Sequence, residues 1–293
     1  MTKLRGEIYV LCRSRSSHHA IRVFKDRSPF HFQVEIALKE IKYPWDVESS
    51  EKDNCLYICE VNCVWKITRE TGDQHKIMKW LTTDYEPSTL SMSIDGQLLM
   101  VRHTPPCLMI YGSDAELVHS IPLAQDIKYP HHAVETSIGN FIIIHNEEEE
   151  VMEDDLALME GGMQKERLDG KEGKRGSSGL RMLTKLVVSE LTRDGQMVIR
   201  RYNPSDKTQQ MYYSRYISLD SDDRVFVADH GNHRVILLDS DLKWNRILCP
   251  TEEEKEETMI REPGRLCYDE EMKQLIVGRI LGKEVNVYTL RRY

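Results

Sequence analysis

The sequence predicts an all-β fold made of six similar units, and three observations support this prediction. Proline-led apolar runs recur at Pro44, Pro87 and Pro130, which are spaced 43 residues apart. Short alternating runs rich in β-branched residues lie between these prolines and are punctuated by Gly, Asn and Asp, a pattern typical of strands. Four strands in about 40–45 residues is the size of one propeller blade. We therefore expect a six-bladed β-propeller.

The third unit shows the internal order of one repeat. A proline-led run, Thr89–Ile94, is followed by the turn pair Asp95-Gly96 and then by a second apolar run. An Asp-Gly pair between alternating runs favours a hairpin, and two more strand-like runs complete the unit. Units with this order begin near residues 6, 41, 84, 126, 208 and 260.

Together the units predict one propeller domain, residues 6–293. The first unit, 6–40, has no proline-led opening strand, and the last unit ends after its third strand. One strand is therefore expected to be missing at each terminus. Two interpretations remain: the ring closes imperfectly, or the chain is cut from a longer protein.

Residues 146–185 interrupt the fourth unit between its second and third strands. The segment begins with the acidic run Glu147–Glu150 and contains a Gly-, Ser- and Lys-rich stretch at 170–179. Charge runs and Gly/Ser without periodicity are typical of disorder. We expect a disordered acidic and glycine-rich insertion within blade four.

Composition and charge limit the class of partner. The net charge is −8, which does not suit a globally basic nucleic-acid binder, and no DNA partner is expected. The start of the chain is too polar for a signal peptide, and no apolar run reaches about 18 residues. We therefore expect a cytoplasmic protein with no membrane partner.

The seven cysteines lie mostly inside apolar runs, which indicates reduced, packed thiols rather than a disulfide framework. The spacing of Cys55, Cys59 and Cys63 is compatible with zinc, but neither a second CxxC nor a histidine pair follows. Small core residues explain these three positions better. We expect no metal and no cofactor.

The fifth unit carries the most specific motif, the run from Asp222 to Asp239. It resembles an NHL repeat, in which a strand ending in Ala-Asp is followed by a turn with Asn and by a second strand ending in Asp. The matching residues are Asp229, Asn232, His233, Arg234 and Asp239. The resemblance implies that Asn232 occupies the turn and that Asp229 pairs with Arg234. The other units are degenerate: the second keeps Asn62, the first keeps Arg22-Val23, and the third, fourth and sixth keep mainly the strand order.

NHL propellers stand at the C-terminus of tripartite-motif ubiquitin ligases, or in RNA-binding and scaffold proteins. This chain contains no RING or B-box pattern, no P-loop and no HExxH or GxSxG motif. The resemblance therefore implies a non-catalytic binding module, either a protein-interaction scaffold or the target-recognition propeller of a ubiquitin-ligase assembly. The alternatives are a single-stranded RNA-binding propeller and, third, a metal-dependent propeller hydrolase.

Candidate binding residues lie in the loops that enter the innermost strands and in those that join second to third strands, because a propeller places both on one face. These loops are rich in Arg, His and aromatic residues, which bind RNA phosphates and bases and also form protein hot spots. The tyrosines before the prolines have an alternative role in packing between blades. The candidates are Arg13, Arg15, His18, His19, Tyr43, Trp45, Arg102, His103, His131, His132, His145, His230, Arg215, Arg265 and Arg279.

Overall fold

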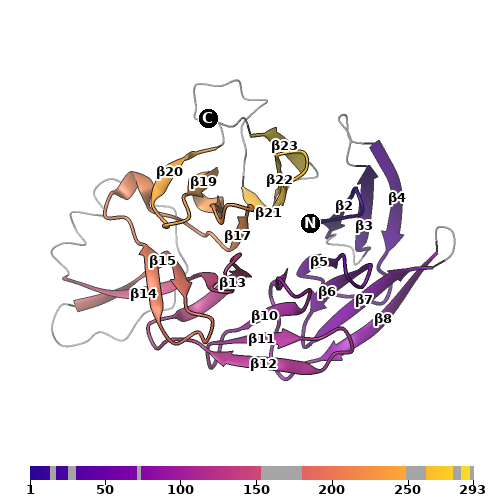
Figure 1. Ribbon diagram of the computed structural model, residues 1–293, viewed down its shortest axis with the longest axis horizontal. Coiled ribbons are helices and arrows are strands. Elements are labelled where there is room, and N and C mark those ends of the chain that lie inside the picture. The colour runs from indigo at the N-terminus through magenta and orange to yellow at the C-terminus, as the bar shows by residue number, and fades with distance from the viewer. Residues whose placement is uncertain are drawn as a thin grey trace.

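Six antiparallel sheets stand around a central axis, and strands that follow one another in the sequence lie side by side in each sheet (Figure 1). The prediction of a six-bladed, all-β propeller is confirmed. The computed structural model describes residues 1–13, 18–25, 31–70, 74–152, 180–248, 262–279 and 285–290.

Each of the first five blades has four strands, and the sixth has three in the described part of the chain. The first blade holds β1 (Thr2–Leu4), β2 (Glu7–Cys12), β3 (Ala20–Lys25) and β4 (His31–Ala37). The second holds β5 (Asp46–Ser50), β6 (Cys55–Glu60), β7 (Cys63–Arg69) and β8 (His75–Thr82). The third holds β9 (Leu90–Met92), β10 (Leu98–Arg102), β11 (Cys107–Tyr111) and β12 (Leu117–Pro122). The fourth holds β13 (Lys128–Glu135), β14 (Phe141–Met152), β15 (Leu180–Leu191) and β16 (Val198–Tyr202). The fifth holds β17 (Tyr216–Leu219), β18 (Val225–Asp229), β19 (Arg234–Leu238) and β20 (Trp244–Ile247), with short 3₁₀ turns η1 (Lys207–Gln209) and η2 (His230–Asn232). The sixth holds β21 (Pro263–Asp269), β22 (Gln274–Arg279) and β23 (Val285–Thr289).

The first blade is more complete than the sequence predicts. Strand β1 pairs with β2 from Thr2↔Tyr9 to Leu4↔Glu7 and supplies the innermost strand that we expected to be missing. The propeller therefore begins before residue 6. Its three residues, Thr-Lys-Leu, are too short and too polar to show alternation, which is why the repeat pattern misses them.

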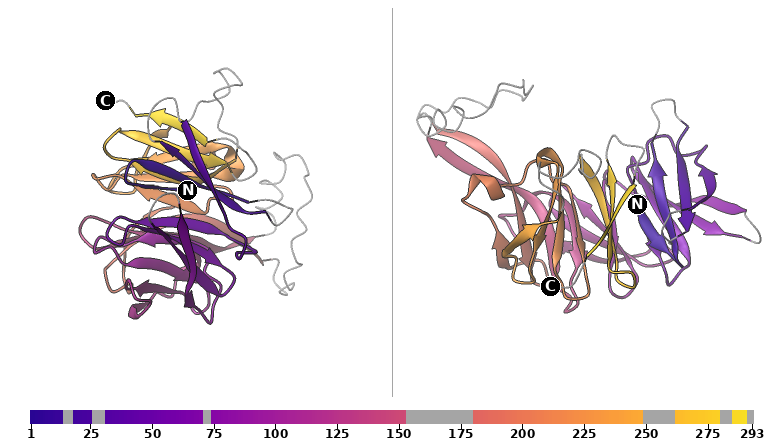
Figure 2. Two further views of the ribbon diagram at one scale, coloured as in Figure 1. Left: turned by 90° about the vertical axis from the view of Figure 1, so that its right-hand side faces the viewer. Right: turned by 90° about the horizontal axis from the view of Figure 1, so that it is seen from above.

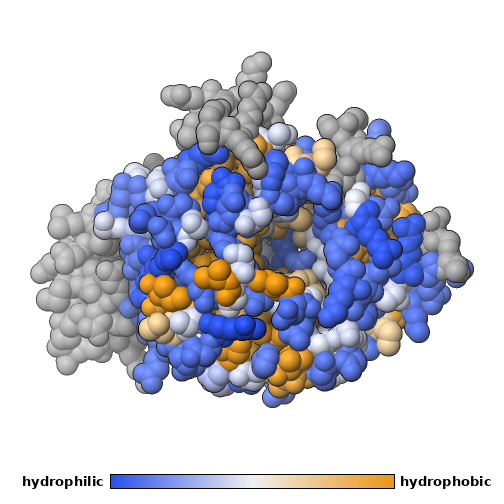
Figure 3. All heavy atoms as spheres, in the orientation of Figure 1, coloured by the Kyte–Doolittle hydropathy of each residue, from blue (hydrophilic) through white to orange (hydrophobic). Residues whose placement is uncertain are grey.

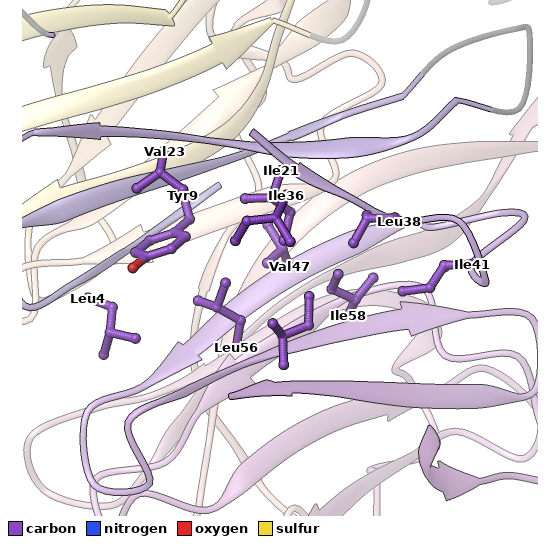
Figure 4. Packing of buried hydrophobic residues seen from close by; sticks show 11 residues of the cluster. Leu4, Tyr9, Ile21, Val23, Ile36, Leu38, Ile41, Val47, Leu56 and Ile58 are labelled. Atoms are coloured by element: carbon purple, nitrogen blue, oxygen red, sulfur yellow. The ribbon is translucent and has the colours of Figure 1, made fainter. Parts of the chain in front are cut away.

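Apolar side chains fill the spaces between adjacent blades. Between the first and second blades, Tyr9 and Ile21 meet Val47, Leu56 and Ile58 (Figure 4). Alternate residues of a strand point to opposite faces of its sheet, so each blade offers one apolar face to each neighbour. Comparable clusters lie between the second and third, third and fourth, fourth and fifth, and fifth and sixth blades.

The first and sixth blades close the ring by side-chain packing. Ile8 of β2 and Ile276 of β22 are both buried in one cluster with Met1. Next to it, Lys3 Nζ lies 2.5 Å from Oδ2 of the buried Asp269. These contacts join the blades without a shared sheet, because the sixth sheet contains only β21, β22 and β23 among the described residues.

Strands β14 and β15 continue into both ends of the segment 146–185. Their ladder extends to the pair Met152↔Leu180, and the hairpin projects beyond the rest of the ring (Figure 2). The expectation of disorder is thus wrong for 146–152 and 180–185, and residues 153–179 lie outside the described part. At the base of the hairpin, Glu147 lies opposite Lys185 in the ladder and accepts hydrogen bonds from Arg201 and Asn203.

Helices are nearly absent from the described residues, and none of them is long and apolar enough to cross a membrane.

Candidate functional site

The two faces of the ring carry different connections. On the face that we call the entry face, loops lead into innermost strands (38–45, 83–89, 123–127 and 203–215) and join second to third strands (61–62, 103–106 and 230–233). On the opposite face, which we call the turn face, turns join innermost to second strands (5–6, 51–54, 93–97, 136–140, 220–224 and 270–273).

Contacts between the two types of entry-face loop agree with the predicted grouping. The Thr83 amide donates to the Asn62 carbonyl at 2.9 Å, and His103 Nε2 lies 3.2 Å from Ser88 Oγ. The loops that we predicted to share a face are therefore neighbours.

Asp229, at the end of β18, holds the loop that enters its own blade. Its Oδ1 accepts from the Tyr212 amide at 2.7 Å and from Ser214 Oγ at 3.0 Å. Its Oδ2 accepts from Arg234 Nε at 2.7 Å and from Asn232 Nδ2 at 2.8 Å. The ion pair predicted between Asp229 and Arg234 is present, and the buried carboxylate has hydrogen-bond partners on both oxygens. Asp239 has a separate role, since its Oδ1 caps the following turn by accepting from the Lys243 amide at 2.8 Å.

Glu60, at the end of β6, holds the entry loop of the second blade in the same way. Its Oε1 accepts from the amides of Lys42 at 2.7 Å and Tyr43 at 3.0 Å, and its Oε2 accepts from Trp65 Nε1 at 2.7 Å. Burial alone would raise the pKa of Glu60, but these hydrogen bonds lower it below its ordinary value. An acid at the end of the second strand thus fixes the entry loop in two blades.

Arg265 occupies the axis of the ring instead of the entry face. Its Nη1 lies 2.5 Å from Asp46 Oδ2, and its Nη2 lies 2.5 Å from Glu48 Oε2. The guanidinium also donates to the carbonyls of Met1 and Val47, both at 3.2 Å. The side chain is 11% exposed, so the prediction that Arg265 is a surface binding residue is wrong.

The ring of Tyr216 completes the surroundings of this arginine, with the guanidinium carbon 4.6 Å from the ring centre. Burial alone would lower the pKa of Arg265, but Asp46, Tyr216 and Glu48 raise it above its ordinary value. The guanidinium is therefore a fixed charge that is neutralised by two carboxylates.

Three predicted binding histidines are buried structural residues. His132 Nδ1 accepts from the Ile217 amide at 3.3 Å, and His145 Nε2 lies 2.8 Å from Ser189 Oγ. His19 Nε2 lies 2.8 Å from the Lys42 carbonyl. Burial, with a smaller contribution from Arg265, lowers the pKa of His132 to about 3, and burial lowers that of His145 to about 4. The rings of His132 and His145 are therefore neutral, and all three histidines hold innermost strands and entry loops together.

Other candidates do meet on the entry face. The rings of His103 and His131 lie 6.2 Å apart, and His131 Nε2 lies 3.1 Å from Asn146 Oδ1. Burial and the charge of Arg215 lower the pKa of His103, while the same two causes, opposed by the Asn146 hydrogen bond, lower that of His131 to about 4. The third, fourth and fifth blades therefore bring two neutral imidazoles and one exposed guanidinium together.

Exposed aromatic rings also lie on the entry-face loops and, for Tyr129, at the start of β13. Tyr43 is 64% exposed and Tyr129 53% exposed, so neither fills a gap between blades. Trp45 is 40% exposed, and the guanidinium carbon of Arg13 lies 4.6 Å from the centre of its ring. Tyr213 is also exposed, beside Tyr212. The sequence left open a role in packing between blades for the tyrosines that precede the prolines. These exposed tyrosines do not have that role.

The remaining candidates have mixed positions. His18 is exposed, Arg102 is half-buried and donates to the Pro105 carbonyl at 3.3 Å, and Arg279 is half-buried. His230 is half-buried, and its Nδ1 has no hydrogen-bond partner among the described residues. Arg15 lies outside the described residues.

Metal binding gains no support from the side chains that the structure describes, which contain no group of three or more metal-ligating residues. Cys55, Cys59 and Cys63 are buried. Burial raises the pKa of all three, which keeps them as thiols. This agrees with the prediction that they are core residues.

The ionic group on the axis was missed by sequence reasoning, although the sequence contains a signal for it. Asp46 and Glu48 occupy alternate positions of a strand that is otherwise suited to burial, so both point to the same face of their sheet. Arg265 stands near the start of the innermost strand of another blade. Opposite charges at such positions of two innermost strands predict a pair across the axis.

No protein-family model and no curated protein matches this sequence. Solved structures share its fold. A chain titled Kuenenia stuttgartiensis hydrazine synthase is 16% identical with a TM-score of 0.57, over 99% of this chain and 83% of that one. A chain from a nidogen/laminin complex is 11% identical with a TM-score of 0.60, over 97% and 90%. A protein from Lactobacillus plantarum is 10% identical with a TM-score of 0.56, over 98% and 80%. At these identities the likeness establishes the propeller fold alone.

Proposed function

We propose that this chain is a non-catalytic binding module whose entry face receives a protein partner. The observation that carries the proposal is the set of exposed rings on the entry loops of the second and fifth blades and at the start of β13 in the fourth. These rings are Tyr43, Trp45, Tyr129, Tyr212 and Tyr213. Aromatic residues are enriched among the hot spots of protein interfaces.

The hydrogen bonds that fix the loops carrying these rings support the proposal. Glu60 fixes the amide of Tyr43, and Asp229 fixes the amide of Tyr212. Loops held in this way lose little conformational entropy when a partner binds, which favours affinity. The rings are therefore exposed on a rigid frame.

Charge on the same loops favours a protein over RNA. The exposed bases on these loops are matched in number by exposed acids, and the Arg13 guanidinium already covers the ring of Trp45. The exposed bases are Arg13, Lys39, Lys42, Lys207 and Arg215. Single-stranded RNA binders combine a basic groove with open rings for base stacking. The exposed acids on these loops are Glu40, Asp84, Glu86, Asp126 and Asp206.

The motif of the fifth blade suggests which kind of assembly the chain belongs to. Because Asp229, Asn232 and Arg234 resemble an NHL repeat, we propose target recognition in a ubiquitin-ligase-type assembly as the role of the bound face. RNA binding stays the second candidate, since Arg215 and the exposed rings could contact phosphates and bases.

Photo-crosslinking tests the proposed face. A benzophenone amino acid placed at Tyr43 or Tyr213 is expected to capture a protein partner in cells, whereas the same group at Phe32, an equally exposed ring on outer strand β4, is not. With the captured partner purified, Tyr213→Ala should weaken binding and Phe32→Ala should not. Equal capture from Phe32 would contradict the proposal.

RNA binding is tested with a single-stranded oligonucleotide at two salt concentrations. An RNA-binding face should lose affinity steeply as salt rises, in proportion to the phosphates contacted. If the oligonucleotide binds tightly, if its affinity falls with salt and if Arg215→Ala abolishes this binding, the partner of the entry face is RNA and not a protein.

A further inference from the structure

A cavity of about 240 Å³ lies on the axis, between Arg265 and the turn face. It is separate from the entry face, because Arg265 and its partners stand between them. Figure 3 shows the turn face with a hollow near the centre of the ring. Its wall is formed by the later residues of the innermost strands, among them Met92, Val134, Leu219 and Leu266.

We propose that this cavity binds a small organic ammonium ion, with its hydrocarbon part against the apolar wall and its charge at Glu135. The site lies on the opposite face from the proposed protein-binding surface and does not depend on that function.

The first argument for a cationic ligand is the charge of the residues that line the cavity. Arg265 is the cation among the lining residues, and Asp46 and Glu48 already neutralise it. Glu135 also lines the cavity, accepts the Ile94 amide at 2.9 Å through Oε2, and forms no ion pair in the described part of the chain. A bound cation would supply the counter-charge that Glu135 lacks, whereas a bound anion would be repelled by Glu135.

The turns around the mouth add to this preference. They contain eight acids and four bases, so their summed field attracts cations toward the axis. The acids are Glu51, Asp53, Asp95, Asp220, Asp222, Asp223, Glu270 and Glu271, and the bases are Arg5, Lys52, Arg224 and Lys273.

The apolar wall and the size of the cavity limit the rest of the ligand. Ile217 and Val134 line the cavity, and Ile138, on the turn after β13, is 73% exposed. Pockets for drug-sized ligands span about 300–1,000 Å³, so this cavity takes a smaller molecule. Ser218 also lines it, and its hydroxyl has no hydrogen-bond partner among the described residues, so it can accept from an ammonium N–H. An alkylammonium or arylalkylammonium ion meets these requirements.

Calorimetric titration of the whole chain with three matched probes tests the proposal. The probes are 2-phenylethylammonium, the neutral 2-phenylethanol and the anionic 3-phenylpropanoate. The ammonium ion is expected to bind about tenfold or more tightly than the alcohol, because a hydrogen bond to a charged group adds about 1.5–3 kcal/mol. Equal binding of the ammonium ion and the alcohol, or no binding of the ammonium ion, would overturn the proposal.

Two charge-neutralising variants locate the site. Glu135→Gln should weaken binding of the ammonium ion about tenfold and leave binding of the alcohol unchanged, because the new side chain keeps a hydrogen-bond acceptor but not the charge. Glu86→Gln makes the same change in net charge on the entry face and should leave both probes unchanged. Circular dichroism melting confirms that each variant is folded. An equal loss in both variants would show unspecific attraction and overturn the assignment.

Discussion

Arg265 of the sixth blade and Asp46 of the second meet across the axis of the ring, with Nη1 and Oδ2 2.5 Å apart. The same guanidinium reaches Glu48, and Asp46 Oδ2 also accepts the Leu90 amide at 2.9 Å. One buried ionic group thus joins innermost strands of three blades. It also divides the axis, so that the entry face and the turn-face cavity are independent sites.

Replacing the axial arginine should destabilise the whole ring. Arg265→Met is expected to lower the free energy of unfolding by about 3–5 kcal/mol, because two buried carboxylates lose their counter-charge. Urea unfolding measures this. Arg22→Met is the control, since the Arg22–Glu35 pair is 45% and 47% exposed and such surface pairs contribute about 0–1 kcal/mol. Similar losses in both variants would mean that the axial group is not an integral part of the core.

The buried histidines predict how stability depends on pH. In the folded protein the pKa is about 3 for His132 and about 4 for His131 and His145, whereas in the unfolded chain it lies near 6.5. The unfolded state therefore binds more protons between these values. The stability is complete above about pH 7 and decreases as the pH falls through 6.5, by up to about 1.4 kcal/mol per pH unit for each histidine.

Urea midpoints at pH 7, 6 and 5 check this dependence. His145→Gln should reduce the slope of stability against pH, because one of the buried histidines with a lowered pKa no longer titrates. Phe32→Ala, at an exposed position without a titrating group, should leave the slope unchanged. A slope that is the same in wild type and His145→Gln would contradict the role of burial at this ring.

The sequence predicts the fold well because the propeller repeats one local pattern. The prolines at 44, 87 and 130 and the alternating runs after them are visible without any tertiary information. Strand β1 has no such pattern, because pairing with β2 and packing against its neighbours hold three residues that are not strand-like alone. Tertiary contacts therefore stabilise β1, the strand that the sequence pattern does not predict.

The candidate site was harder to predict, because strand phase places a residue on a face but does not give its depth. Arg265 and His132 lie near the starts of innermost strands, as expected, yet both point to the axis and are covered. Tyr43 and Tyr129 precede prolines in the same way and are exposed. Burial depends on which other blade supplies a partner, and one blade's sequence does not contain that information.

The carboxylate of Asp229 should control both stability and the order of its entry loop. Asp229→Ala removes the acceptor of Arg234, Asn232 and the Tyr212 amide, and we expect a loss of about 3 kcal/mol, as for other broken buried charge networks. Hydrogen exchange should show faster exchange of the Tyr212 amide. Asp239→Ala removes only a turn cap and is expected to cost about 1 kcal/mol without affecting that amide.

Closure of the ring rests on Ile276, which is fully buried against Ile8 and Met1 at the contact of the sixth and first blades. Ile276→Ala should lower the free energy of unfolding by about 2–5 kcal/mol, the usual cost of such a cavity. Hydrogen exchange in native buffer should then rise first in β1, β2 and β22, because no shared sheet holds these blades together. Ile110→Ala creates a similar cavity between the third and fourth blades and should instead expose amides of β10, β11 and β13. If both variants opened the same strands, the contact between the first and sixth blades would be no weaker than any other, and closure by packing alone would be refuted.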